Sequence, residues 1–162
     1  MGIVLARIDD RLIHGQVTVG WTRSHNVDQI VIVNDAIAKD PIQSTVLSIA
    51  APPGVDVQAL SVDKFVADFK QGKFDKRRLM LIFTGPREPL MLIRAGVPLH
   101  SINVGGMKFT PERRQISKAV SVSPQEESDF WQIIQSGVEV EVRMFPSDPK
   151  TLIQNLLSRQ EG

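Results

Sequence analysis

The sequence contains no cysteine, which excludes a disulfide framework, a thiolate nucleophile and zinc sites with cysteine ligands. It has no apolar run near the ~20 residues that a membrane-spanning helix needs. The segment Met1–Gly15 carries charges too early for the apolar core of a signal peptide. Nineteen basic and 18 acidic side chains leave a net charge of +1, so nucleic acid is not an expected partner.

What is present is the composition of an ordinary globular protein. The chain has 162 residues, of which 42% are hydrophobic and 23% are charged. This length can bury a core without disulfides or metals. Because no low-complexity linker, fixed-period repeat or break in composition divides the sequence, we expect one domain over residues 1–162.

Short apolar runs alternate along the chain with segments in which apolar residues recur at helical spacing. Strands are expected over 3–7, 29–34, 55–60, 79–83, 101–105 and 138–145, with a short extra strand over 119–123. Helices are expected over 16–26, 41–51, 61–71, 90–95, from 124 onward, and over 149–157. This alternation predicts an α/β fold, an open and mostly parallel twisted sheet with helices on both faces.

In such a sheet, ligands bind beyond the carboxyl ends of the strands, so the residues that leave each strand are the candidates for a site. The first loop runs from Ile8 to Gly15, and later strands are followed by Asn34-Asp35 and by Thr84-Gly85. We expect these segments, with Gly15 at the start of the next helix, to share one crevice.

The first loop is the richest in chemistry, because a histidine and an arginine lie close together in it. His14 could be a general base, a metal ligand, a covalent nucleophile or a packed structural residue. Arg11 could bind an anion beside the imidazole through its planar fork. The amides that open the next helix at Gly15 could also meet a phosphoryl oxygen. These features favour a nucleophilic imidazole that accepts a phosphoryl group.

Two carboxylates precede this pair. Asp9 or Asp10 could fix the tautomer of His14 by a hydrogen bond, or could orient Arg11. The simpler alternative for either carboxylate is a salt bridge with Arg7 or Arg11.

Other kinds of site have less support. Asp9, Asp10 and His14 could hold one metal ion, which leaves a metal-dependent hydrolase as an alternative, but His25 and His100 have no metal-ligand spacing to His14. The nucleotide motifs GxxxxGK[ST] and GxGxxG and the nucleophile elbow GxSxG are missing. No cofactor and no metal are expected.

Two further features lie in the second half of the chain. Gly105-Gly106 is expected to form a tight turn, although the missing side chains would also let a backbone approach the first loop closely. Arg113, Arg114 and Lys118 form a basic run, which is expected to be either a solvated face or a docking surface for an acidic partner.

Residues 6–17, ARIDDRLIHGQV, resemble the phosphorylation-site signature of enzyme IIB subunits of the sugar phosphotransferase system, in the mannose/fructose/sorbose family. The resemblance continues in residues 103–107, 114–121 and 147–148, so it covers nearly the whole chain. Gly105-Gly106-Met107 is similar to the mannose, fructose and sorbose branch, whereas the galactosamine branch often differs there.

The resemblance implies that His14 accepts a phosphoryl group from a phosphohistidine of a IIA protein or domain and passes it to a sugar held by the membrane components IIC and IID. It implies that Arg11 steadies the group, that Nδ1 is the reacting nitrogen, and that Asp9 and Asp10 belong to the same site.

The resemblance further implies a protein-phosphohistidine–sugar phosphotransferase in the cytoplasm, bound peripherally at the inner face of the membrane through IIC and IID. The sugar would belong to the mannose, fructose or sorbose class, and a homo-oligomer is compatible with the resemblance. The implied fold adds one antiparallel edge strand to the parallel sheet. A non-catalytic phosphohistidine sensor of the same fold is the alternative.

Overall fold

The computed structural model describes residues 2–158. Its central sheet has seven strands in the order β3-β2-β4-β1-β5-β8-β9. The bounds in this sheet are β1 Gly2–Asp9, β2 Gln29–Val33, β3 Asp56–Leu60, β4 Arg78–Phe83, β5 Ser101–Gly106, β8 Glu139–Val142 and β9 Thr151–Leu152. All neighbouring strands pair in parallel except β8 and β9, which are antiparallel. A separate antiparallel hairpin joins β6 (Arg114–Ser117) to β7 (Val120–Val122).

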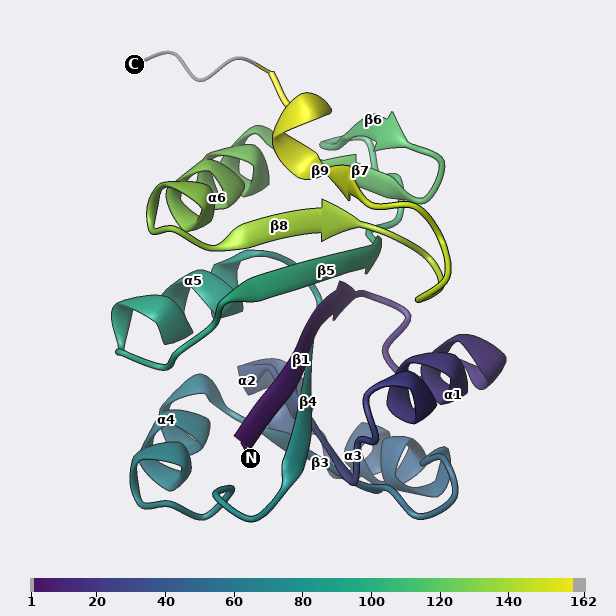
Figure 1. Ribbon diagram of the computed structural model, residues 1–162, viewed down its shortest axis with the longest axis vertical. Coiled ribbons are helices and arrows are strands. Elements are labelled where there is room, and N and C mark those ends of the chain that lie inside the picture. The colour runs from purple at the N-terminus through teal and green to yellow at the C-terminus, as the bar shows by residue number, and fades with distance from the viewer. Residues whose placement is uncertain (1, 159–162) are drawn as a thin grey trace.

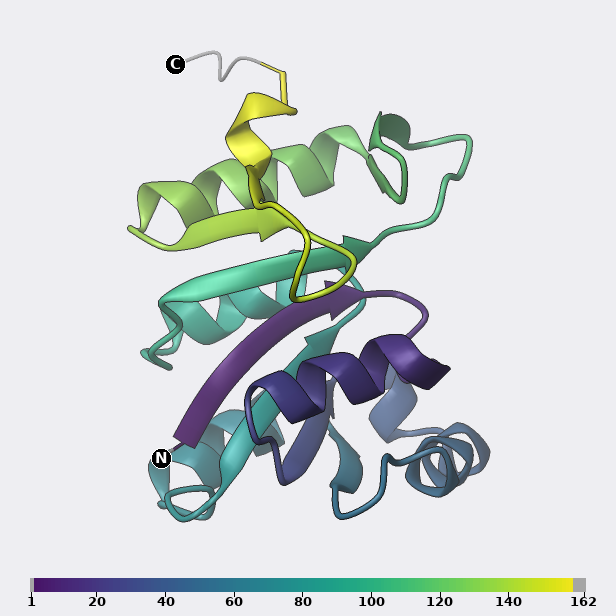
Figure 2. The ribbon, with the colours of Figure 1, turned by 45° about the vertical axis from the view of Figure 1, so that its right-hand side comes forward.

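Helices cover both faces of the sheet (Figure 1). Their bounds are α1 Gly15–Ser24, α2 Asp35–Ala38, α3 Pro41–Ile49, α4 Val62–Lys70, α5 Arg87–Arg94 and α6 Pro124–Gln135. In both views α1 and α3 lie on one side of the sheet, and α4, α5 and α6 lie on the other (Figures 1 and 2). The predicted mostly parallel sheet with helices on both faces and one antiparallel edge strand is confirmed.

Two hydrophobic clusters correspond to the two faces. The β-branched and leucine-rich central strands supply both clusters, because strands covered on both sides alternate their side chains between two buried layers. Trp21 of α1 and Leu47 of α3 pack in one cluster, and Phe65 of α4 and Phe130 of α6 pack in the other. The core therefore holds β1, which leads directly into the first loop, rigidly from both sides.

In the C-terminal part of the chain one expected element is wrong and one is shorter than expected. Residues 149–157 form no long helix: β9 is followed by a single 3₁₀ turn, Ile153–Asn155. The reason is a tertiary pairing, since Glu141 and Val142 of β8 align with β9. The strand expected over 138–145 is confirmed as β8 over Glu139–Val142; beyond it, the Met144 carbonyl accepts the indole N–H of Trp21 at 2.8 Å.

The first strand is longer than expected, and Gly105-Gly106 is not a turn. β1 continues to Asp9, so this carboxylate belongs to a strand end. Gly105 and Gly106 close β5, and the register shifts there so that Ile8 aligns with Val104 but Asp9 aligns with Gly106. This irregularity resembles a β-bulge, which re-aims nearby side chains.

Among residues 2–158, no helix is long and apolar enough to cross a membrane.

Candidate functional site

The loop after β1 is held in an unusual backbone conformation at the carboxyl edge of the sheet. The N–H of Leu12 donates to the Asp9 carbonyl at 3.0 Å, and Leu12 has a φ of 64°. A left-handed conformation at a leucine costs about 1–2 kcal/mol. The buried Leu12 side chain packs in the same cluster as Trp21, which offsets this cost. His14 then occupies the N-cap position of α1 with extended backbone angles.

Asp9 is the centre of the site. Its side chain is completely buried and binds three cationic or potentially cationic groups. Arg7 Nη2 lies 2.9 Å from Oδ2, and Arg11 contacts both oxygens, through Nε at 2.9 Å and Nη2 at 2.8 Å. His14 Nε2 lies 3.1 Å from Oδ2. Asp9 therefore holds the arginine and the imidazole of the loop together.

The charge on Asp9 is stabilised by these partners. Burial alone would raise the pKa of this carboxyl, but the hydrogen bonds from Arg11 and His14 and the charge of Arg7 outweigh it and lower the pKa. The pKa of Arg11 is raised, mainly by the hydrogen bond to Asp9. The pair therefore remains ionised across the neutral pH range.

Behind Asp9, a buried polar row crosses three strands. Arg7 of β1, Asn103 of β5 and Glu141 of β8 align directly with one another. Arg7 Nη1 donates to the Asn103 side-chain oxygen, and Asn103 Nδ2 donates to Glu141 Oε1 at 3.1 Å. The Arg7 guanidinium also lies 5.0 Å from the centre of the Trp21 ring. Burial lowers the pKa of Arg7, although Asp9 opposes this effect.

The two glycines of β5 make room for this arrangement. A Cβ on Gly105 would overlap the Arg7 guanidinium, and a Cβ on Gly106 would lie 2.9 Å from Arg11 Nη2. As expected, the backbone at these glycines lies close to the first loop, where the Asp10 N–H donates to the Gly106 carbonyl at 3.0 Å, and the missing side chains also make room for two guanidinium groups.

Asp10 points away from His14. Its Oδ2 accepts the Lys108 backbone N–H at 2.8 Å and lies 3.5 Å from Arg113 Nη1. Arg113 in turn binds both carboxylate oxygens of Glu126 at the start of α6, at 2.9 and 2.8 Å. Asp10 thus ties the loop to the second half of the chain.

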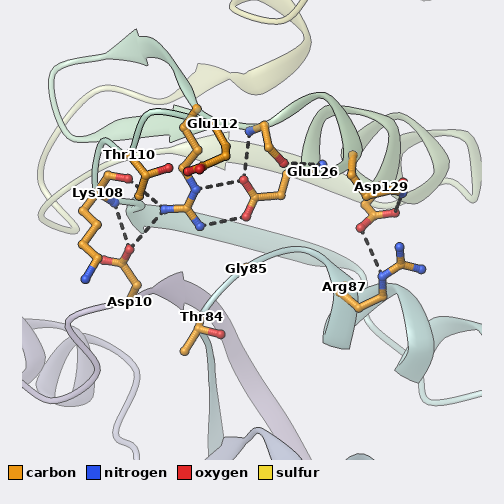
Figure 3. Close-up of a pocket in the computed structure, with 12 residues that line it drawn as sticks. Asp10, Thr84, Gly85, Arg87, Lys108, Thr110, Glu112, Glu126 and Asp129 are labelled. Atoms are coloured by element: carbon orange, nitrogen blue, oxygen red, sulfur yellow. Dashed lines mark hydrogen bonds and ion pairs between the residues drawn. The ribbon is translucent and has the colours of Figure 1, made fainter.

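Asp10 lines an open cleft of about 540 Å³. Figure 3 shows its carboxylate beside Lys108, with Thr84 and Gly85 on the facing loop. Arg87 lies at the other end of the cleft from Asp10, where its Nε is 3.4 Å from Asp129 Oδ2 (Figure 3). The cations and carboxylates of this cleft therefore largely satisfy one another.

The other predicted crevice residues have structural contacts. Asn34 Oδ1 accepts the Ile37 N–H at 2.9 Å as the cap of α2, and its Nδ2 donates to Thr84 Oγ1 at 3.3 Å. Asp35 accepts the N–H of Val62 at 2.9 Å, at the start of α4. Thr84 and Gly85 share the cleft with Asp10, whereas none of these contacts reaches His14.

The structure also bears on the alternatives raised by the sequence. Within the range 2–158 there is no grouping of three or more His, Asp or Glu side chains that could hold a metal ion. Asp10 is turned to Lys108, so it does not join Asp9 and His14 as a ligand set. In the basic run, Arg113 is largely buried and pairs with Glu126, whereas Arg114 is 50% exposed and pairs with Glu127.

Sequence reasoning missed Asn103, Glu141 and Trp21 as parts of the site, and it treated Arg7 only as a salt-bridge partner. The available signal was a charged or amide side chain inside an apolar strand, as at Arg7 and Asn103. Such a residue must find a partner when it is buried.

Comparison with known proteins finds similarity to IIB components of the phosphotransferase system. A family described as PTS system sorbose subfamily IIB component matches residues 3–162. A sorbose-specific EIIB component of Lacticaseibacillus casei is 42% identical over 151 residues, which cover 93% of this chain and 92% of the relative. A mannose-specific EIIAB component of Escherichia coli is also 42% identical over 98% of this chain, but the chain spans only 49% of that protein. The crystal structure of the IIBSor domain of the Klebsiella pneumoniae sorbose permease superposes with a TM-score of 0.92 at 40% identity, covering 96% of this chain and 95% of that domain.

Proposed function

This chain belongs to the sorbose subfamily of IIB components of the phosphotransferase system, which act in sugar phosphotransfer, and from this premise we propose that His14 Nδ1 carries the phosphoryl group. The observation that supports this most directly is the contact between His14 Nε2 and Asp9. Among residues 2–158, Nδ1 has no hydrogen-bond partner, and the His14 side chain is 24% exposed. The nitrogen opposite Asp9 is therefore available to a donor.

Asp9 supports the reaction by fixing the imidazole. With the proton on Nε2 facing the carboxylate, the lone pair of the neutral ring lies on Nδ1. Attack of this pair on the donor's phosphorus forms the new N–P bond as the N–P bond of the donor phosphohistidine breaks. The His14 ring then carries a positive charge, and the buried carboxylate of Asp9 lies 3.1 Å away to stabilise it.

Arg11 supplies charge for the transferred group. Its hydrogen bonds with residues of the described chain all run through its backbone N–H, Nε and Nη2, so the Nη1 amino group is left to meet phosphoryl oxygens. Its side chain is 40% exposed and its geometry is set by two bonds to Asp9. A fixed, permanently charged fork neutralises equatorial oxygens without reorganisation during transfer.

We propose that the donor is a IIA protein or domain and that the acceptor is a sugar of the mannose, fructose or sorbose class, held by the membrane components IIC and IID. The fused mannose-specific EIIAB relative supports the IIA assignment. In the second step the sugar oxygen bonds to phosphorus, its hydroxyl proton is released, and the N–P electron pair returns to Nδ1. The protein would then work in the cytoplasm at the inner face of the membrane.

The test is the intact mass of the protein after incubation with phosphoenolpyruvate, enzyme I, HPr and a competent IIA. We expect one acid-labile phosphate on the wild type, none on His14→Ala, and one on His100→Ala, which changes an exposed histidine outside the site. A phosphate that persists on His14→Ala would refute the assignment. Transfer of the phosphate to sugar in vesicles that contain IIC and IID would separate a carrier from a sensor that only holds it.

A further inference from the structure

We propose that two exposed phenylalanines, Phe109 and Phe145, form the apolar anchors by which the phosphoryl donor protein docks over His14. This inference rests on the proposed function and names the surface that recognises its protein partner. Phe109 is 67% exposed and Phe145 is 42% exposed. Large apolar side chains with this exposure mark contact surfaces when they gather at a site.

Phe109 belongs to the segment between β5 and β6, which contacts the loop at Asp10. It directly follows Lys108, whose backbone N–H donates to Asp10 at 2.8 Å. The same segment is fixed further along, because Arg113 Nη1 donates to the Lys108 carbonyl at 2.8 Å. The backbone that carries Phe109 is thus tied to the loop that carries His14.

Phe145 belongs to the segment between β8 and β9, on another side of the loop. Figures 1 and 2 both show this segment beside the end of β1, and its Met144 carbonyl binds Trp21 in the second half of α1. Phe145 directly follows Met144, whose sulfur lies 3.3 Å from Arg11 Nη2 and whose carbonyl accepts from Trp21. Met144 therefore adjoins Arg11 directly, and we call the two segments that carry Phe109 and Phe145 the rim of the site.

A tight turn holds Phe145 in place. The Phe145 N–H donates to Asp148 Oδ2 at 2.9 Å, and the Asp148 N–H donates back to the Phe145 carbonyl at 3.1 Å. Ser147-Asp148 is one of the short segments on which the family resemblance rests, and the phosphoryl chemistry makes no use of it. The turn instead gives the Phe145 backbone a fixed conformation at the rim, which lowers the entropic cost of docking.

The transfer geometry dictates what covers this rim. In transfer between two imidazoles, one phosphorus must lie in line between both rings, so the donor's surface must come down on the residues around His14. Buried aromatic side chains contribute much of the binding energy in protein contacts, and a guanidinium beside them favours an anionic partner. The exposed Arg11 between these segments matches the phosphoryl charge that the donor brings.

The donor is the favoured occupant, rather than the membrane acceptor. Its reacting group is a side chain fixed to a protein surface, whereas the acceptor atom is the hydroxyl of a small sugar. The chain's other large exposed hydrophobic side chains, within the part that the structure describes, lie on α3 and α5: Ile42, Val46, Ile49 and Met91. α3 and α5 cover opposite faces of the sheet, so these four side chains do not form one apolar surface around the loop (Figure 1).

The test measures the initial rate of phosphate loading against the concentration of phospho-IIA for Phe109→Ala, Phe145→Ala and Ile49→Ala. Ile49 is 80% exposed on α3 and serves as the matched control. We expect each phenylalanine variant to raise KM about 10-fold, equivalent to ~1.4 kcal/mol of binding, with kcat and the thermal midpoint unchanged. Ile49→Ala should keep the wild-type KM, and Phe109→Leu and Phe145→Leu should recover most of the loss.

Four outcomes would overturn the inference. Both phenylalanine variants could load with the wild-type KM, or Ile49→Ala alone could raise KM, which would place the donor over α3. A fall in kcat at constant KM would show that the phenylalanines position the loop instead of binding the donor. A larger loss in discharge to sugar in IIC/IID vesicles than in loading would assign the rim to the acceptor. Failure of the proposed function is distinct, because the wild type itself would then take up no phosphate.

Discussion

Asp9 and Asp10 are neighbours in the sequence, but their carboxylates differ in burial and in their partners: the Asp9 side chain is 0% exposed and the Asp10 side chain 13%. Asp9 is fully buried and binds Arg7, Arg11 and His14. Asp10 lies at the edge of an open cleft, where its partners are a backbone N–H and a cation 3.5 Å away. A buried charge depends on the protein for all its compensation, whereas water replaces lost partners at a cleft. Changes on the Asp9 side should therefore have far larger effects than changes on the Asp10 side.

The largest effect is expected from Arg7→Met, which removes one of the positively charged partners of the buried Asp9 carboxylate. Removing one partner of a buried ion pair costs about 3–5 kcal/mol, so the free energy of unfolding in urea should fall by that amount. Arg23→Met is the matched control, because Arg23 is exposed on α1 and should change stability little. Equal losses in the two variants would contradict the importance of the buried row.

A smaller effect is expected from acid, because a protonated Asp9 keeps its hydrogen-bond partners. The folded-state pKa of Asp9 is below its ordinary value of 3.8, so its ionisation contributes stability that is complete above 3.8 and is lost as the pH falls through the lower folded pKa. Urea titrations over this acid range should show a steeper loss for the wild type than for Asp9→Asn. Asp56→Asn, at a largely exposed side chain, should keep the wild-type slope.

The smallest effect is expected from Asp10→Asn. The asparagine oxygen can still accept the Lys108 N–H, so only the charge attraction to Arg113 at 3.5 Å is lost, which should cost about 1 kcal/mol at these largely buried side chains. Phosphate loading should stay within a few-fold of the wild type, whereas Asp9→Asn should nearly abolish it. If Asp10→Asn stopped loading in a protein that is still folded, the cleft would take part in the chemistry and the comparison would fail.

The contrast between these carboxylates also shows how far the sequence leads. The periodicity of the apolar runs predicts the parallel sheet and its helices. Strands such as 79–83 are buried on both faces and therefore consist almost entirely of apolar residues. The sequence also places His14, Arg11 and both aspartates in one loop. It does not predict which of the two aspartates is buried, because that depends on the exact residue at which β1 ends. A strand one residue longer or shorter would turn the other carboxylate inward.

Contacts between distant segments account for the rest. Arg7, Asn103 and Glu141 meet only because β5 lies between β1 and β8 in the sheet. β9 likewise depends on its pairing with β8, which the local sequence does not show. The local pattern of residues 149–157 alone predicts a helix. Neither pairing leaves a short-range signal in the sequence.

The left-handed residue Leu12 links the chemistry to the core. Arg11 and His14 flank it, and its side chain is packed in the hydrophobic cluster that α1 and α3 cover. The backbone that carries both functional side chains is therefore held by apolar packing, in addition to the bonds that Asp9 makes with the side chains themselves. A void in that cluster would let the leucine relax to an ordinary backbone conformation and would separate guanidinium from imidazole. Such a protein would lose its activity while it was still folded.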